Sequence, residues 1–241
     1  QLAWCLHMKS KYNETMSMQT QTPSATVDHV RNDPPKFSNL PGRGETADRD
    51  QAAENQYRAV AYSMLAALLR DPPEQEVLNR VTGLADVVED KDDFAVAMSM
   101  LGLSARAACP PELDDEFHAL FIGIGRGELV PYGSWYLTGF LMEKPLGVLR
   151  DDLAAIGYQR SDGIREPEDH VAALCEVMAL MINDGHSLEQ QSLFFDRHIA
   201  SWFGTFFMDL GEAKSAVFYR SVARFGRAFF DFEKQYLAMG V

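Results

Sequence analysis

The chain has 241 residues, 46% of them hydrophobic, and a chain of this size can bury one sizeable core or at most two small ones. Its 35 acidic residues exceed its 22 basic ones, which gives a formal net charge of −13 at pH 7. Such a charge repels nucleic acids and anionic membranes and attracts basic peptides, so we predict no nucleic-acid partner and no stable membrane insertion. An acidic surface that only keeps the protein soluble remains an alternative.

The three cysteines, Cys5, Cys109 and Cys175, are far apart and form no Cys-x-x-Cys pair. This spacing indicates neither a disulfide framework nor a zinc ribbon, and it fits a reducing compartment. No stretch approaches the roughly 20 apolar residues that span a bilayer, and the opening "QLAWCLH" is too short for a signal-peptide core. We therefore expect a cytosolic protein.

Residues 1–50 show no sustained apolar period, and from residue 8 onward they are rich in Ser, Thr, Asn, Pro and Gly. Such a composition cannot bury enough apolar surface to offset the entropy lost on ordering. We predict a disordered tail over residues 1–50.

From residue 51 the pattern is helical. Asp48 or Asp50 is a candidate cap for a first helix, which Pro72 and Pro73 would end. Further helices are expected over 74–81, 92–103, 111–122, 134–142, 145–156, 167–183, 188–208 and 214–237. No run alternates polar and apolar residues as a strand would. The fold class is therefore all-α, with one compact helical bundle over residues 51–241.

The motif "EPEDH", residues 166–170, stands directly before a strongly apolar stretch. Neighbours on a helix point about 100° apart, so Asp169 and His170 cannot form a hydrogen-bonded acid/base pair. The histidines lack the spacing of a metal-binding helix, and we predict no metal. A helix start is a good alternative, with Pro167 in the first turn and the acids at the positive end of the helix dipole. A helix start does not explain why a histidine, His170, follows the acidic residues.

The stretch "LFIGIGRGELVPYGSWYL", residues 120–137, contains three closely spaced glycines. It is a weak candidate for a phosphate loop, because no strand precedes it and no Gly-Lys-Ser/Thr follows. The alternative is a connection between two helices, with Ser134 capping the second. Aromatic residues around it could form core, or they could line a peptide groove.

Three blocks, "FHALFIG" (117–123), "PYGSWYL" (131–137) and "EPEDH" (166–170), occur in this order inside an acidic helical domain. Together they resemble the TorD/DmsD/NarJ family of cytosolic redox-enzyme maturation chaperones, and their order is closer to the TorD and DmsD branches. The resemblance covers roughly residues 51–237.

The resemblance implies a chaperone and not an enzyme. Its partners would be the catalytic subunit of a molybdopterin-dependent oxidoreductase and that subunit's twin-arginine leader. The chaperone would hold the immature subunit until the molybdenum cofactor is inserted. Proteins that deliver the cofactor are further partners that this role allows. No cofactor of its own and no catalytic residue are implied. Carried over residue by residue, the leader-binding positions are Phe117, Leu120, Phe121, Pro131, Tyr132, Tyr136, Glu166, Asp169 and His170.

A leader with a basic front and an apolar middle needs carboxylates beside an apolar groove. We expect Glu166, Glu168 and Asp169 to face the arginines, and the aromatic residues to bury the apolar part. Two alternatives stay open, a nucleotide-binding or nucleotide-hydrolysing enzyme and a plain helical interaction module. We expect a monomer, or a dimer that exchanges elements through a hinge at 157–166.

Overall fold

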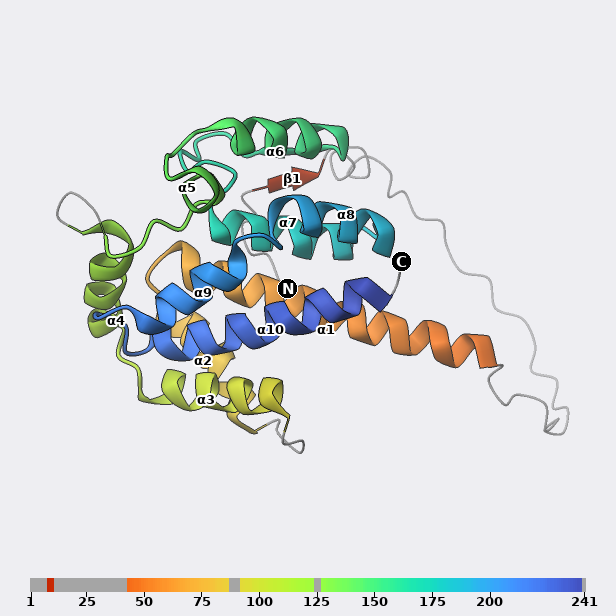
Figure 1. The fold of residues 1–241 in the computed structure, drawn as a ribbon. Coiled ribbons are helices and arrows are strands. Elements are labelled where there is room, and N and C mark those ends of the chain that lie inside the picture. The colour runs from red at the N-terminus through yellow and green to blue at the C-terminus, as the bar shows by residue number, and fades with distance from the viewer. Residues whose placement is uncertain (1–7, 11–42, 87–91, 124–126, 240–241) are drawn as a thin grey trace, which may run out of the picture.

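The computed structural model describes residues 8–10, 43–86, 92–123 and 127–239, and most of them are helical (Figure 1). The prediction of an all-helical domain is confirmed. In chain order the elements are β1 (Met8–Ser10), α1 (Arg43–Arg70), α2 (Gln75–Thr82), the 3₁₀ turn η2 (Gly83–Asp86), α3 (Asp93–Ala107), α4 (Pro110–Phe117), the π-helical turn η3 (His118–Ile122), α5 (Gly133–Thr138), α6 (Lys144–Ala155), β2 (Tyr158–Arg160), α7 (Val171–Asn183), α8 (Leu188–His198), α9 (Phe203–Glu212) and α10 (Tyr219–Met239).

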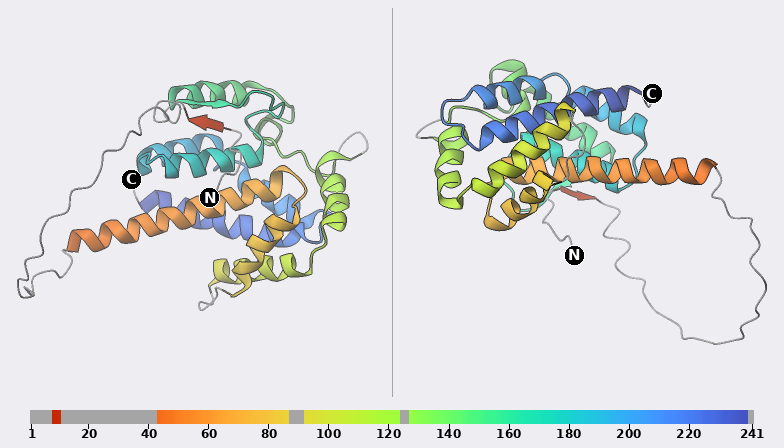
Figure 2. Two further views of the ribbon diagram at one scale, coloured as in Figure 1. Left: turned by 180° about the vertical axis from the view of Figure 1, so that it is seen from behind. Right: turned by 90° about the horizontal axis from the view of Figure 1, so that it is seen from below.

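Helix α7 lies at the centre of the bundle. Every residue from Val171 to Ile182 is buried except the half-buried Ala173, as expected of a helix whose residues over this span are apolar apart from Glu176. It packs along α1 and against α8, while α10 packs on α9 and α3. Helices α5 and α6 lie on one side of this core, and α2 and α3 lie on the opposite side (Figure 1; Figure 2).

The N-terminal region differs in part from the prediction. Helix α1 begins at Arg43, so it extends across the boundary expected at residue 50, and both candidate caps lie inside it. Within the expected tail, β1 pairs antiparallel with β2, with Met8 opposite Arg160. Each strand has three residues, which is too short to produce a periodic pattern. Residues 1–7 and 11–42, which make up most of the expected tail, lie outside the described residues.

The helix expected over 188–208 is two helices in the structure. The chain turns at residues 199–202 between α8 and α9, and Ile199 and Trp202, at the two ends of this turn, are buried. Trp202 donates an indole hydrogen bond to the carbonyl of His198 at 2.8 Å and stacks on Tyr136. The break is a tertiary effect, because the apolar pattern runs through it without interruption.

Helix α10 begins at Tyr219, five residues later than expected. The preceding loop is held by two distant carboxylates instead of a local cap. Glu116 accepts hydrogen bonds from the backbone N–H groups of Val217, Phe218 and Tyr219, and Glu128 accepts those of residues 214 and 215. Negative charge at this end of α10 also complements the helix dipole.

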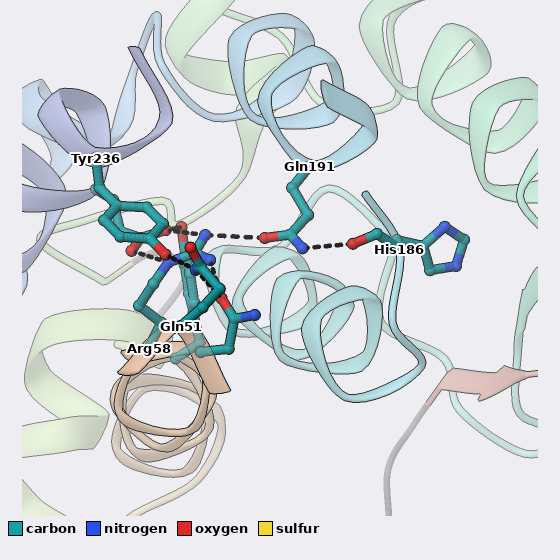
Figure 3. Close-up of polar contacts among 8 residues, drawn as sticks. Gln51, Arg58, His186, Gln191 and Tyr236 are labelled. Atoms are coloured by element: carbon teal, nitrogen blue, oxygen red, sulfur yellow. Dashed lines mark hydrogen bonds and ion pairs between the residues drawn. The ribbon is translucent and has the colours of Figure 1, made fainter. Parts of the chain in front are cut away.

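A buried polar network joins α1, α8 and α10 (Figure 3). Arg58 donates to both carboxylate oxygens of Glu233 at 2.6 and 3.0 Å, and to Gln191 at 2.9 Å. Tyr62 donates a further hydrogen bond to Glu233 at 3.0 Å, and the ring of Tyr236 lies over the guanidinium at 4.3 Å. Arg58 and Glu233 are 1% and 0% exposed, so the ion pair is fully removed from water.

Candidate functional site

Residues 166–170 form a turn that precedes α7 and do not belong to the helix. The prediction that Pro167 occupies the first helical turn is therefore wrong. The N-cap is His170, whose Nδ1 accepts a hydrogen bond from the backbone N–H of Ala172 at 3.1 Å. A histidine follows the acids because its ring nitrogen performs the capping that Ser, Thr, Asn or Asp usually provides.

Asp169 is 4% exposed and is directed toward α5. Its Oδ2 accepts a hydrogen bond from the N–H of Ser134 at 2.7 Å, and its carbonyl accepts one from Gly133 at 2.8 Å. Ser134 is therefore not the N-cap that the sequence predicted, since the cap position is Tyr132. These bonds, with an antiparallel bridge between Tyr132 and His170, join the second and third sequence blocks.

The other two acids of the motif also have partners within the chain. Glu168 is 8% exposed and pairs with Arg150 at 2.8 Å and, more loosely, with Arg160 at 3.7 Å. Glu166 is exposed and accepts a hydrogen bond from the hydroxyl of Tyr132. Burial and this contact with Glu166 raise the pKa of Tyr132, so its hydroxyl stays a donor at neutral pH.

The block at 117–123 ends in a π-helical turn, a feature found frequently at functional sites. Gly123 closes the turn by donating its N–H to the carbonyl of His118 at 2.7 Å, with a positive φ of 59°. Leu120 points into the core, with no exposed surface, whereas Ile122 is 52% exposed. Phe121 packs on Phe117 with ring centroids 4.9 Å apart.

A pocket of about 790 Å³ lies where the three blocks meet. Six of the residues carried over from the family line it, namely Phe117, Phe121, Pro131, Tyr132, Glu166 and His170. The other three do not. Leu120 and Asp169 are buried behind its wall, and Tyr136 stacks on Trp202 and donates to Asp209 at 3.0 Å.

The pocket also contains charged residues that sequence reasoning missed. Arg70, at the end of α1, forms an ion pair with Glu176 of α7. Asp71 and Asp114 line the rim and also line a second pocket of about 590 Å³. A signal for Glu176 was present in the sequence, because it is the one charged residue in α7.

His170 sits half-buried beside Tyr132, with ring centroids 5.0 Å apart. Burial, reinforced by the positive charge of Arg70, lowers the pKa of His170 to about 3. The imidazole is therefore neutral at physiological pH, and its Nδ1 can act as the cap acceptor.

This cap predicts a pH-dependent stability. An unfolded histidine titrates near pH 6.5, so between about pH 6.5 and 3 the unfolded state binds the proton and the folded state does not. The stabilisation is complete above about pH 6.5 and is lost as the pH falls toward 3. Between pH 7.5 and 5.5, the free energy of unfolding should fall by about 1 kcal/mol more in the wild type than in His170→Asn, which keeps a cap acceptor.

The measurement is denaturant unfolding of both proteins at the two pH values. His198, whose pKa is also lowered by burial, contributes equally to both proteins, so the difference between them reports on His170. Equal losses in the two proteins would show that His170 does not carry the pH dependence.

The family model of the nitrate reductase delta subunit matches residues 75–208. The chain belongs to this family. The matched segment runs from α2 to α9 and includes all three blocks, so the predicted TorD/DmsD/NarJ resemblance is confirmed.

Curated relatives agree with this assignment. A chaperone protein TorD from Vibrio atlanticus is 26% identical over 212 residues, which cover 79% of this chain and 99% of that protein. A chaperone protein TorD from Vibrio cholerae is 28% identical over 204 residues, covering 76% and 93%. These relatives are named as chaperones, which agrees with the prediction of a chaperone.

A solved structure from Archaeoglobus fulgidus, described as a redox enzyme maturation protein, has the same fold with a TM-score of 0.51. It is 19% identical and covers 71% of this chain and 93% of that one. Within the part of this chain that the structure describes, no helix is long and apolar enough to cross a membrane.

Proposed function

We propose that this protein is a cytoplasmic maturation chaperone that binds the twin-arginine leader and the immature form of a molybdopterin-dependent oxidoreductase. It thereby assists insertion of the molybdenum cofactor and delays export through the twin-arginine pathway. The observation that carries the proposal is the pocket of about 790 Å³, where residues of all three blocks converge. The family and the names of the relatives support a maturation chaperone in general, and the pocket chemistry supports a peptide leader as ligand.

The pocket combines an apolar wall with carboxylates. Its larger apolar residues are Phe117, Phe121, Ile122, Pro131, Tyr132 and Ile164, and three arginines, Arg70, Arg160 and Arg165, also line it. A volume in the range of 300–1,000 Å³ is typical of ligand sites that bury most of their ligand, and this one can hold several side chains of an extended or helical peptide. Affinity should rest mainly on this apolar burial, because an exposed ion pair contributes only about 0.2–1 kcal/mol.

The net charge of −13 suits the same ligand. It attracts the basic front of a leader over a distance of about a Debye length and orients it at the pocket. Salt should therefore weaken binding without abolishing it.

The test is calorimetric titration of the full chain with synthetic twin-arginine leaders of molybdoenzymes from the same genome. We expect saturable binding of one leader, which is weaker at moderate than at low salt and is lost when the apolar middle of the leader is removed. If no leader binds to the folded protein, a twin-arginine leader is not the ligand and this part of the proposed function is wrong.

A matched pair of variants locates the site. Ile122→Ser changes an apolar side chain that is 52% exposed in the pocket, and Leu193→Ser changes one that is 60% exposed on α8, outside the pocket. Both should fold, since neither side chain belongs to the core. Ile122→Ser should weaken leader binding roughly fivefold to tenfold, as expected for losing about 1 kcal/mol of apolar burial, and Leu193→Ser should leave it unchanged.

A further inference from the structure

Glu176 is an unusual residue for its position. It belongs to α7, is 3% exposed, and has apolar neighbours on both sides along the helix. Its Oε1 pairs with Arg70, but its Oε2 is buried and has no hydrogen-bond partner among the described residues. A buried carboxylate oxygen without a donor is energetically costly. Because Glu176 lines the pocket of about 790 Å³, a ligand in that pocket can supply the missing donor.

The surroundings of Glu176 select a cationic ligand group. Asp71 and Asp114 line both pockets and are exposed at the place where the two adjoin. Glu74 and Glu76 line the smaller pocket, and Arg70 is the one cationic residue among its described lining residues, whereas Arg160 and Arg165 line the larger pocket only. Since Arg70 is already paired with Glu176, this end of the site attracts positive charge and repels phosphate groups.

The acids that the sequence predicted for this task are occupied. Asp169 binds the backbone at the start of α5, and Glu168 is paired with Arg150. Glu166, which is exposed, accepts a hydrogen bond from Tyr132 with one of its two carboxylate oxygens. Among the described residues that line the pocket, the carboxylate oxygen that is buried without a donor is Oε2 of Glu176, and Asp71 and Asp114 line the same pocket.

We propose that Glu176, together with Asp71 and Asp114, forms the subsite that receives an arginine side chain of the ligand. The inference rests on the proposed function and gives the leader a direction, with its basic front between α1, α4 and α7 and its apolar middle along Phe121 and Ile164. A guanidinium suits the subsite better than an ammonium, because its planar fork of N–H donors can reach Glu176 Oε2 and a rim carboxylate together. Glu176 then bridges two guanidinium groups, that of Arg70 and that of the ligand.

The experiment is a set of double-mutant cycles by titration of the full chain, with one leader that carries its two arginines and one in which both are glutamine. The first variant is Asp71→Asn combined with Asp114→Asn, which changes two exposed side chains and leaves the core intact. Its dissociation constant for the arginine leader should rise roughly tenfold, and that for the glutamine leader less than about twofold.

Glu176→Gln removes the buried charge but keeps the shape. Its affinity for the arginine leader should fall by about thirtyfold or more, again with little effect on the glutamine leader. If Glu176→Gln fails to fold, the rim variant still tests the subsite. The control is Asp115→Asn, because Asp115 is an exposed neighbour on the same helix as Asp114 and lines neither pocket.

The outcomes separate the inference from the proposed function. Suppose that the wild type binds the arginine leader. If the rim variant then binds both leaders as well as the wild type does, or loses the same factor of affinity for both, the subsite is wrong and the chaperone function stands. If the wild type binds neither leader, the proposed ligand is wrong and the subsite falls with it.

Discussion

Replacing Arg58 by methionine should lower the free energy of unfolding by about 3–5 kcal/mol, because it leaves the carboxylate of Glu233 buried without its cation. Burial alone would lower the pKa of Arg58, but its hydrogen bond and charge contact with Glu233 keep that pKa raised. The arginine therefore stays charged in the core, and Glu233 depends on it. Denaturant unfolding at neutral pH measures the loss.

The double variant distinguishes a coupled pair from two separate packing effects. Arg58→Met combined with Glu233→Met removes both charges and should be more stable than Arg58→Met alone, since no buried charge remains unpaired. The exposed pair of Arg227 and Asp231, at 3.1 Å on α10, is the control. Arg227→Met should cost less than about 0.5 kcal/mol. Additive losses at Arg58 and Glu233 would show that the two residues do not act as a pair.

The Arg58 network sets the relative positions of helices that are distant in sequence. It connects α1 with α8 through Gln191 and with α10 through Glu233 (Figure 3). Gln191 also donates to the carbonyl of His186, which precedes α8. Because the far end of α1 carries Arg70 and Asp71 to the pocket, this network stabilises the helix that forms one wall of the site.

The sequence predicted the helices well where a periodic apolar face decides the structure, as in α2, α3 and α6. It failed where tertiary contacts decide. Nothing in the local pattern indicates that Trp202 would interrupt the helix after α8, or that Glu116 would hold the start of α10 from a distant helix. Such contacts join residues far apart in the chain, so no local rule contains them.

In the candidate site, too, the sequence predicted the location better than the tertiary contacts of each residue. The three blocks located the pocket, since residues of each block line it. The role of each residue did not follow. Asp169 was expected to face the arginines of a leader, and it is buried with its carboxylate bound to the N–H of Ser134 in α5. Conversely, the sequence analysis did not predict Glu176 as a site residue, although a single charge in a buried helix is itself a signal of a specific partner.

Asp169→Ala should lower the free energy of unfolding by about 1.5–3 kcal/mol, because the buried N–H of Ser134 loses a charge-assisted hydrogen bond of 2.7 Å. Asp169→Asn keeps an oxygen that can accept this bond and should lose less than half as much. Asp162→Ala is the control, since Asp162 is exposed in the same connection. Denaturant unfolding gives all three values.

Leader binding then decides between two roles for Asp169. It anchors the first residues of α5, and the adjoining Tyr132 forms part of the pocket wall, so we expect Asp169→Ala to weaken binding of the arginine leader and the glutamine leader by the same factor. A direct contact with the leader arginines, as the sequence predicted, would instead weaken only the arginine leader, and would do so in Asp169→Asn as well, because the amide has lost the negative charge. Equal factors would place Asp169 among the residues that position the pocket and would leave the recognition of arginine to Glu176 and the two rim aspartates.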